Sequence, residues 1–170
     1  MEPLRIEENY RPLLIAGLSS TYLFDSPMDI NSQWQKFNSM KEWIPEKKND
    51  YAYGICIDLD HGKGIRYVSG VEVSSIKNLP GTMSSRELSS FTYAVFAHNG
   101  HVYTISNTCD IIWKEWIPES GVGKPENADF FFERYSEEFD PRKGFGGIEI
   151  WIPVVNNTRI QKGYWHENNT

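Results

Sequence analysis

A carboxylate and an indole alternate with isoleucines near the end of the chain, in Ile148-Glu149-Ile150-Trp151-Ile152. Because strand side chains alternate between two faces, the isoleucines share one face while Glu149 and Trp151 share the other. Burial among aromatic rings should raise the pKa of Glu149 unless a cation or hydrogen-bond donors accompany it. A cationic guest would resolve this conflict, since desolvated aromatic faces attract cations by about 0.5–2 kcal/mol each. The pattern fits a solvated sheet face equally well.

Tyr135 is a second candidate because it closes an aromatic run at residues 130–135. Alternation places Phe131, Glu133 and Tyr135 on one face of a strand and the other three residues on the opposite face. If the face with Tyr135 lines a pocket, its hydroxyl can hydrogen-bond Glu149 or a ligand. The alternative is a half-buried tyrosine whose hydroxyl meets water, the commoner outcome for a strand tyrosine.

Metal and nucleophile chemistry find less support in the sequence. His98 and His101 have a spacing seen in metal sites, and Cys109 follows them, but a strand-to-helix turn is expected between the two histidines. His61 and His166 belong to a turn and a tail. There is no Gly-x-Ser-x-Gly, phosphate loop or dinucleotide fingerprint. We therefore predict no metal, no cofactor and no strong catalytic motif.

Composition limits the classes of function. The 170 residues suit one domain, and 14% of them are aromatic, so some rings are expected to line a cavity. The formal charge of −6 argues against nucleic acid as a direct partner, because phosphate binding relies on clustered Lys and Arg. Two cysteines make no disulfide framework, and neither a signal peptide nor a membrane span is visible. We expect a cytoplasmic protein.

The first half of the chain predicts the order strand, helix, strand, strand. Residues 13–24 are apolar and aromatic with an internal glycine, as in a long strand. A helix is predicted over residues 30–43, because apolar residues recur at helical spacing until Pro45 excludes helical geometry at the preceding residue. Residues 51–59 and 64–73 read as a hairpin.

The second half repeats this order. Residues 87–98 predict a strand, and residues 102–116 predict a helix that stops before Pro118. Residues 129–135 and 147–154 predict two further strands. Strand, helix, strand, strand twice over indicates an α+β domain with a mostly antiparallel sheet and two helices packed on one side.

A repeated hexapeptide supports this duplication: Lys-Glu-Trp-Ile-Pro-Glu occurs at residues 41–46 and again at residues 114–119. Two pseudo-symmetric modules meet at a seam, which is a natural place for a ligand pocket. The predicted division is a single domain at 1–155, with module one at about 10–75 and module two at about 86–155, and a polar tail at 156–170.

The large aromatic residues of the modules are candidates for the core and for the pocket. Trp43 and Trp116 occupy the same place in the two hexapeptides, so we expect each to secure a helix end to its own module. Trp116 is also a candidate for presenting an edge to the cavity. Tyr93 and Phe96, on the strand predicted to form the seam, are further candidates for lining it.

Four stretches in order, at residues 93–100, 113–121, 132–135 and 148–154, resemble the gyrase-inhibitory-protein-like family. This family includes the effector-binding domains of multidrug-responsive bacterial transcription regulators, and the resemblance is strongest over residues 91–154. It implies two strand-helix-strand-strand modules enclosing an aromatic pocket with an acidic residue at its base. In the regulators of the family, such a pocket receives lipophilic cations.

Three functions from different classes follow. The first is a stand-alone protein that binds lipophilic cationic compounds, without a DNA-binding segment of its own. The second is a small hydrolase in which Glu149 beside Tyr135 acts as general base. The third is a gyrase-inhibitory interaction protein whose acidic surface engages a topoisomerase. Separately, exposed strand edges could pair two copies of the chain as a homodimer. The predicted ligand-binding residues are Glu149, Trp151, Tyr135, Trp116, Tyr93 and Phe96.

Overall fold

The computed structural model describes residues 1–59 and 62–155. The predicted polar tail at 156–170 and part of the predicted hairpin turn lie outside these residues. None of the helices in the described ranges is long and apolar enough to cross a membrane. The strands are β1 (Arg5–Tyr10), β2 (Leu13–Leu23), β3 (Lys47–Asp58), β4 (Gly64–Val73), β5 (Ser84–Leu88), β6 (Phe91–His98), β7 (Phe130–Tyr135) and β8 (Ile148–Val154). The helices are α1 (Ile30–Met40), α2 (Ile105–Ile111) and α3 (Ile117–Ser120).

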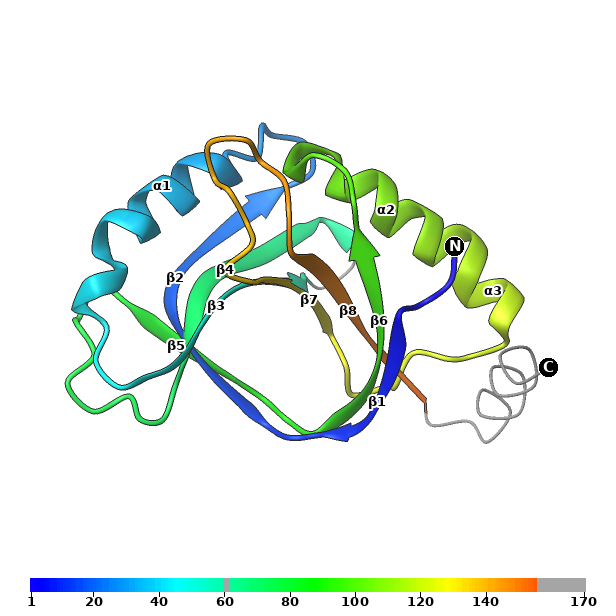
Figure 1. Cartoon of the computed structure of the whole chain (residues 1–170), viewed down its shortest axis with the longest axis horizontal. Helices are drawn as coiled ribbons and strands as arrows, with labels where there is room; N and C mark the ends of the chain where they lie inside the picture. The colour runs from blue at the N-terminus through cyan, green and yellow to red at the C-terminus, as the bar shows by residue number, and fades with distance from the viewer. Residues whose placement is uncertain (60–61, 156–170) are drawn as a thin grey trace.

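All eight strands form one curled antiparallel sheet, in the order β1-β6-β8-β7-β3-β4-β2-β5. The helices lie along the outside of the curl, with α1 over one half and α2 and α3 over the other (Figure 1). The two halves are joined at the centre, where β3 pairs with β7 from Ala52↔Tyr135 to Ile57↔Phe130. We call the outer side of this junction, between α1 and α2, the seam. The predicted α+β fold of two strand-helix-strand-strand units is confirmed.

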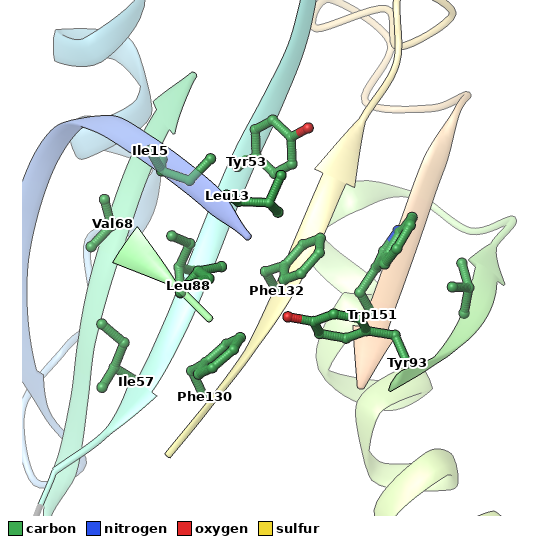
Figure 2. Close-up of a cluster of buried hydrophobic side chains, with 12 residues drawn as sticks. Leu13, Ile15, Tyr53, Ile57, Val68, Leu88, Tyr93, Phe130, Phe132 and Trp151 are labelled. Carbon is green, nitrogen blue, oxygen red and sulfur yellow. The ribbon is translucent and has the colours of Figure 1, made fainter. Parts of the chain in front are cut away.

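The inner face of the sheet encloses an aromatic core. One buried cluster combines Leu88 on the edge strand β5 with Val95 on β6, and Tyr10 on the opposite edge strand β1 packs against it, which shows that the sheet curls around the cluster. Figure 2 shows Phe132, Tyr93 and Trp151 at its centre. The rings of Phe132 and Trp151 are stacked with centroids 5.2 Å apart. The inner face is therefore packed by the chain's own side chains.

Two smaller clusters attach the helices to the outer face. Phe37 and Ile44 pack under α1 against β2 and β4. The isoleucines of β8 pack under α2 and α3, as their alternation predicts. Alternate residues of a strand thus face either the inner core or the helices on the outer face.

Three boundaries differ from the sequence-based expectations. β1 was not predicted, and it covers the edge of β6. The strand predicted at residues 87–98 is two strands, because the chain bends after Leu88 and β5 pairs with β2 while β6 pairs with β8. The second helix does not stop before Pro118. A π-helical turn at Ile112–Trp116 places Pro118 in the first turn of α3, where its missing N–H is not needed.

The identical hexapeptides adopt different structures. Trp116 is 4% exposed and meets the ring of Phe96 edge-on at 5.0 Å, whereas Trp43 is 66% exposed. The prediction that Trp43 secures its helix end is therefore wrong. After Trp43 the chain becomes extended at Ile44, and Ile44 is the buried residue there. After Trp116 the helix continues, which keeps the indole on the core face.

This difference predicts unequal costs for the same substitution. Trp116→Ala should lower the free energy of unfolding by about 3–5 kcal/mol, because it leaves a cavity in the core. Trp43→Ala should change it by no more than about 0.5 kcal/mol, as expected for a surface position. Urea unfolding of both variants checks this, and equal losses would contradict the different burial of the two indoles.

Candidate functional site

Glu149 lies on the inner face beside Trp151, as its alternation predicts, but it is already paired. Its carboxylate accepts hydrogen bonds from Arg5 Nη1 at 2.7 Å, Arg134 Nη2 at 2.8 Å and Trp151 Nε1 at 2.9 Å. Burial by itself would raise the pKa of Glu149, but the hydrogen bond from Arg5 and the positive charge of Arg134 outweigh it and hold this pKa below its usual value. The carboxylate therefore already has the cations that the sequence predicts it to need.

The aromatic faces around Glu149 are occupied by the same arginines. The guanidinium of Arg134 lies 4.4 Å from the ring centroid of Tyr51 and 4.5 Å from that of Trp151. Arg5 lies 5.3 Å from the Trp151 ring. A hollow of about 350 Å³ opens beside Arg134 and Glu149. The charged residues that line this hollow are Arg134, Glu138 and Glu149, so a cation entering it would meet an arginine that is already paired with Glu149.

The six predicted ligand-binding residues are divided between the two faces of the sheet. Glu149, Trp151 and Tyr93 face the inner core. Tyr135, Phe96 and Trp116 belong to the cluster under α2 and α3. The expected hydrogen bond from Tyr135 to Glu149 does not form, because the two side chains project from opposite faces, and the Tyr135 hydroxyl instead donates to Glu133. Whether any of the six contacts a ligand stays a prediction.

A second carboxyl group lies at the seam. Glu133 Oε2 accepts hydrogen bonds from the hydroxyls of Tyr135 at 2.7 Å and Tyr67 at 2.8 Å. Trp34, on α1, extends this network by donating Nε1–H to the Tyr67 oxygen at 2.9 Å. We call Trp34, Gly54, Tyr67, Glu133 and Tyr135 the seam cluster. It gathers residues from α1, β3, β4 and β7, and thus from both halves of the fold.

Gly54 makes the room for this arrangement. It pairs directly with Glu133 across β3 and β7. A Cβ atom at Gly54 would lie 2.1 Å from the Tyr67 hydroxyl and 2.6 Å from Glu133 Oε2, closer than real side chains approach. Only glycine therefore leaves space for a carboxyl and a phenol side by side at this position.

Electrostatically, Glu133 is the opposite of Glu149. Glu133 is 7% exposed, and burial raises its pKa, although the hydrogen bonds from Tyr135 and Tyr67 act in the other direction. It forms no ion pair with any described residue. Both tyrosines donate to Oε2, and no described residue is found donating to Oε1. Glu133 is therefore a largely buried carboxyl group with one oxygen that the described residues do not engage.

Aromatic rings surround this carboxyl group. The Trp34 ring lies 5.4 Å from Tyr135 and 6.3 Å from Tyr67, centroid to centroid. On the α2 side, Trp113 in the π-helical turn lies 6.2 Å from Phe131, which shares the outer face of β7 with Glu133. The seam thus has Trp34 beside the partners of the buried acid and Trp113 beside Phe131, a composition suited to flat apolar guests that carry positive charge.

Sequence reasoning missed Glu133, Tyr67 and Trp34 as site residues. A signal for Glu133 was present, because an acid flanked by Phe131 and Tyr135 on a strand with aromatic residues on both faces has little chance of reaching water. Gly54 inside a strand pattern was a second signal, typical of close approach by another group. Nothing in the sequence pairs Tyr67 or Trp34 with either residue, since 66 positions separate Tyr67 from Glu133.

His98 serves the fold, while His61 and His166 lie outside the described residues. His98 is buried, and its ring nitrogens contact Thr108 Oγ1 at 2.8 Å and the carbonyl of His101 at 3.0 Å, which connects the end of β6 to α2. Within residues 1–59 and 62–155, no group of three or more His, Cys, Asp or Glu side chains is arranged to hold a metal ion.

Comparison with known proteins places this geometry among related domains. The model of the GyrI-like small molecule binding domain family matches residues 6–155. The structure of SAV2435 bound to tetraphenylphosphonium superposes with a TM-score of 0.74 at 20% identity, covering 98% of this chain and 99% of that one. A transcription regulation protein from Staphylococcus aureus MU50, described as putative, superposes with a TM-score of 0.67 at 21% identity, covering 91% of this chain and 98% of that one. The EcmrR C-terminal domain superposes with a TM-score of 0.65 at 13% identity, covering 89% of this chain and 96% of that one. No curated protein matches the sequence.

The two acids predict opposite effects of pH on stability. Because the pKa of Glu133 is raised in the folded protein, protonated Glu133 stabilises the fold at pH values below about 4.5, the pKa of a free glutamate. This stabilisation is lost as the pH rises through the pKa of Glu133 in the folded protein. The lowered pKa of Glu149 contributes stability that is present above about 4.5 and lost as pH falls through the lowered value.

Glu133→Gln should therefore remove the high-pH loss, by about 1.4 kcal/mol for each unit by which this pKa is raised. Glu149→Gln should lower stability at neutral pH by about 1–3 kcal/mol, because it leaves Arg5 and Arg134 underpaired. Urea unfolding of both variants from pH 4 to pH 9 measures this contrast. Parallel pH profiles for the two variants would contradict the difference between the acids.

Proposed function

Because the chain belongs to the GyrI-like family of small-molecule-binding domains, we propose that its seam cluster binds lipophilic cations. The observation that carries the proposal is the state of Glu133, a buried carboxyl group without an ion-pair partner in the described residues. Its nearest companions are two phenols and the indole of Trp34. The acid at the base of the expected aromatic pocket is thus assigned to Glu133 in place of Glu149.

The free-energy balance favours a cation at this position. A carboxylate removed from water is costly unless a positive charge accompanies it. Glu149 already has two arginines, so a further cation gains little there. Glu133 has none, and a cation that reaches it would gain the full pairing energy in a poorly solvated site. Each aromatic face that the cation contacts adds about 0.5–2 kcal/mol.

A structural neighbour supports this ligand class. SAV2435 is bound to tetraphenylphosphonium in its structure, and that compound is a permanent cation covered by aromatic rings. At 20% identity the likeness concerns the fold, so the ligand class for this chain depends on the seam cluster itself. EcmrR in its DNA complex also matches, and that match covers 88% of this chain and 56% of the EcmrR chain. A regulatory role for binding in this chain fits that relation.

Ligand entry requires the seam to open. Tyr67 and Glu133 are buried, and Trp34 and Trp113 are only partly exposed. A guest the size of several aromatic rings must therefore part Trp34 from the α2 side. The π-helical turn at Ile112–Trp116 is a local departure from regular α-helix beside the seam, and such turns often occur at functional sites. We propose that the helices separate there when a ligand binds.

The other predicted functions gain no support from the described residues. The predicted hydrolase needs Tyr135 beside Glu149, whereas the two side chains project from opposite faces of the sheet and Glu149 is held by Arg5 and Arg134. Binding of a topoisomerase and a cytoplasmic location stay predictions from the sequence.

A ligand titration tests the assignment. Intrinsic Trp fluorescence should be quenched saturably by tetraphenylphosphonium and far less by neutral triphenylphosphine oxide, since Trp34 lies in the site. Glu133→Gln should weaken the cation by about tenfold or more, which corresponds to the loss of about 1.4 kcal/mol, and should leave the neutral compound unchanged. Glu149→Gln is the matched control because it makes the same chemical change on the other face, and it should alter the dissociation constant by no more than about twofold.

Two outcomes would overturn the assignment. Loss of cation affinity in Glu149→Gln with affinity retained in Glu133→Gln would place the site on the inner face. Equal binding of the charged and neutral compounds would remove the role of the acid altogether.

Affinity for the cation should also depend on pH. Tetraphenylphosphonium does not titrate, and only the ionised form of Glu133 attracts it. Affinity should therefore rise with pH until pH exceeds the raised pKa of Glu133 and then level off, with a proton released on binding below that value. Calorimetry in two buffers of different ionisation enthalpy measures the released proton. A pH slope that persists in Glu133→Gln would show that another group is responsible.

A further inference from the structure

The edge of β2 is only partly covered by its neighbour. β5 pairs with β2 from Leu13↔Leu88 to Gly17↔Ser84, and β2 continues to Leu23 with no strand on that side. At the other edge of the sheet, β1 covers β6. Residues 18–23 of β2 therefore have a strand neighbour, β4, on one side only.

The open segment presents unpaired backbone groups. Phe24 N–H donates to the carbonyl of Lys63 on the β4 side, so the even-numbered residues of β2 point their backbone groups toward β4. Ser19, Thr21 and Leu23 consequently point theirs outward, and of these groups the Leu23 carbonyl already accepts a hydrogen bond from Ser26 N–H at 3.1 Å. Exposed strand edges usually carry charges or proline that prevent pairing, and residues 18–23 contain neither.

A groove of about 600 Å³ lies along this edge, between α1 and residues 81–84. α1 lines it with Asp29, Ser32, Gln33 and Lys36, a single stripe at helical spacing. Asp29 and Lys36 are exposed and form no ion pair with described residues. They lie seven residues apart, or about 10 Å along the helix, so the groove is acidic at one end and basic at the other.

From this we propose that β2 pairs with β2 of a second copy of the chain, antiparallel and centred on Thr21, to form a homodimer with one continuous sheet. A two-fold axis through Thr21 reverses the groove, so Asp29 of each copy meets Lys36 of the partner subunit. It also sets Ser19 opposite Leu23 of the partner subunit, within the open segment. The self-complementary charges favour a second copy over an unrelated extended peptide. The seam lies elsewhere, so this inference is independent of the proposed function.

The outward N–H of Thr21 offers a sharp test. Thr21→Pro removes that N–H, while the ladder to β4 is kept because Thr21 does not donate to it. Sedimentation equilibrium should show the wild type as a dimer that dissociates on dilution, and Thr21→Pro should be monomeric at concentrations where the wild type is dimeric. Thr21→Val keeps the N–H and the β-branched shape and should remain dimeric.

A charge variant decides the matter if Thr21→Pro fails to fold, which circular dichroism will show. Lys36→Glu places like charges at both ends of the interface and should weaken the dimer by roughly 3- to 30-fold. Arg142→Glu, an equal charge change on an exposed loop of the other half, should leave it unchanged. A monomeric wild type would overturn self-pairing and leave the edge to an extended segment of another protein. A dimer that persists in both Thr21→Pro and Lys36→Glu would assign it to another surface.

Discussion

The burial of one carboxyl group without a counter-ion is the constraint on which the outer side of this fold depends. Glu133 is tolerated at the seam because two phenols donate to one of its oxygens and because Gly54, directly opposite, has no side chain to occupy the same space. The network is closed by Trp34 from α1, which couples the first helix to a strand of the second half. The place that joins the two halves therefore also contains a buried acid without an ion-pair partner among the described residues.

On the inner face, carboxylates are paired with positively charged side chains. Glu72 is 1% exposed and accepts hydrogen bonds from Arg11 and Asn49, with Lys48 Nζ 3.1 Å away. Burial by itself would raise the pKa of Glu72, but these hydrogen bonds and positive charges outweigh it and hold the pKa below its usual value, as the arginines do for Glu149. The carboxylates of the inner face thus have cations of their own beside a core of aromatic rings. Of the three carboxyl groups, Glu133 at the seam is therefore the one without an ion-pair partner among the described residues.

Duplication of the fold did not make the two halves equivalent. The first hexapeptide ends α1 and leaves Trp43 in solvent, while the second continues into α3 and buries Trp116. The edges differ as well, since β1 covers much of β6 whereas β5 leaves the end of β2 open. One half therefore contributes a buried acid to the seam, and the other contributes a strand edge with polar walls. The asymmetry allows a ligand site and an assembly surface to lie on separate parts of one small domain.

Alternation and proline placement in the sequence by themselves determined most of the strands, the end of α1 and the orientation of the β8 isoleucines, because these depend on neighbours along the chain. They did not determine β1 or the break before β6, since an edge strand is defined by the strand it pairs with. From the sequence, Glu149 was predicted to be the acid of the pocket. Only the tertiary structure distinguished Glu149 from Glu133, because the pKa of a buried carboxyl depends on whether arginine or tyrosine arrives from distant segments. Arg5 is 144 positions from Glu149, and Tyr67 is 66 from Glu133.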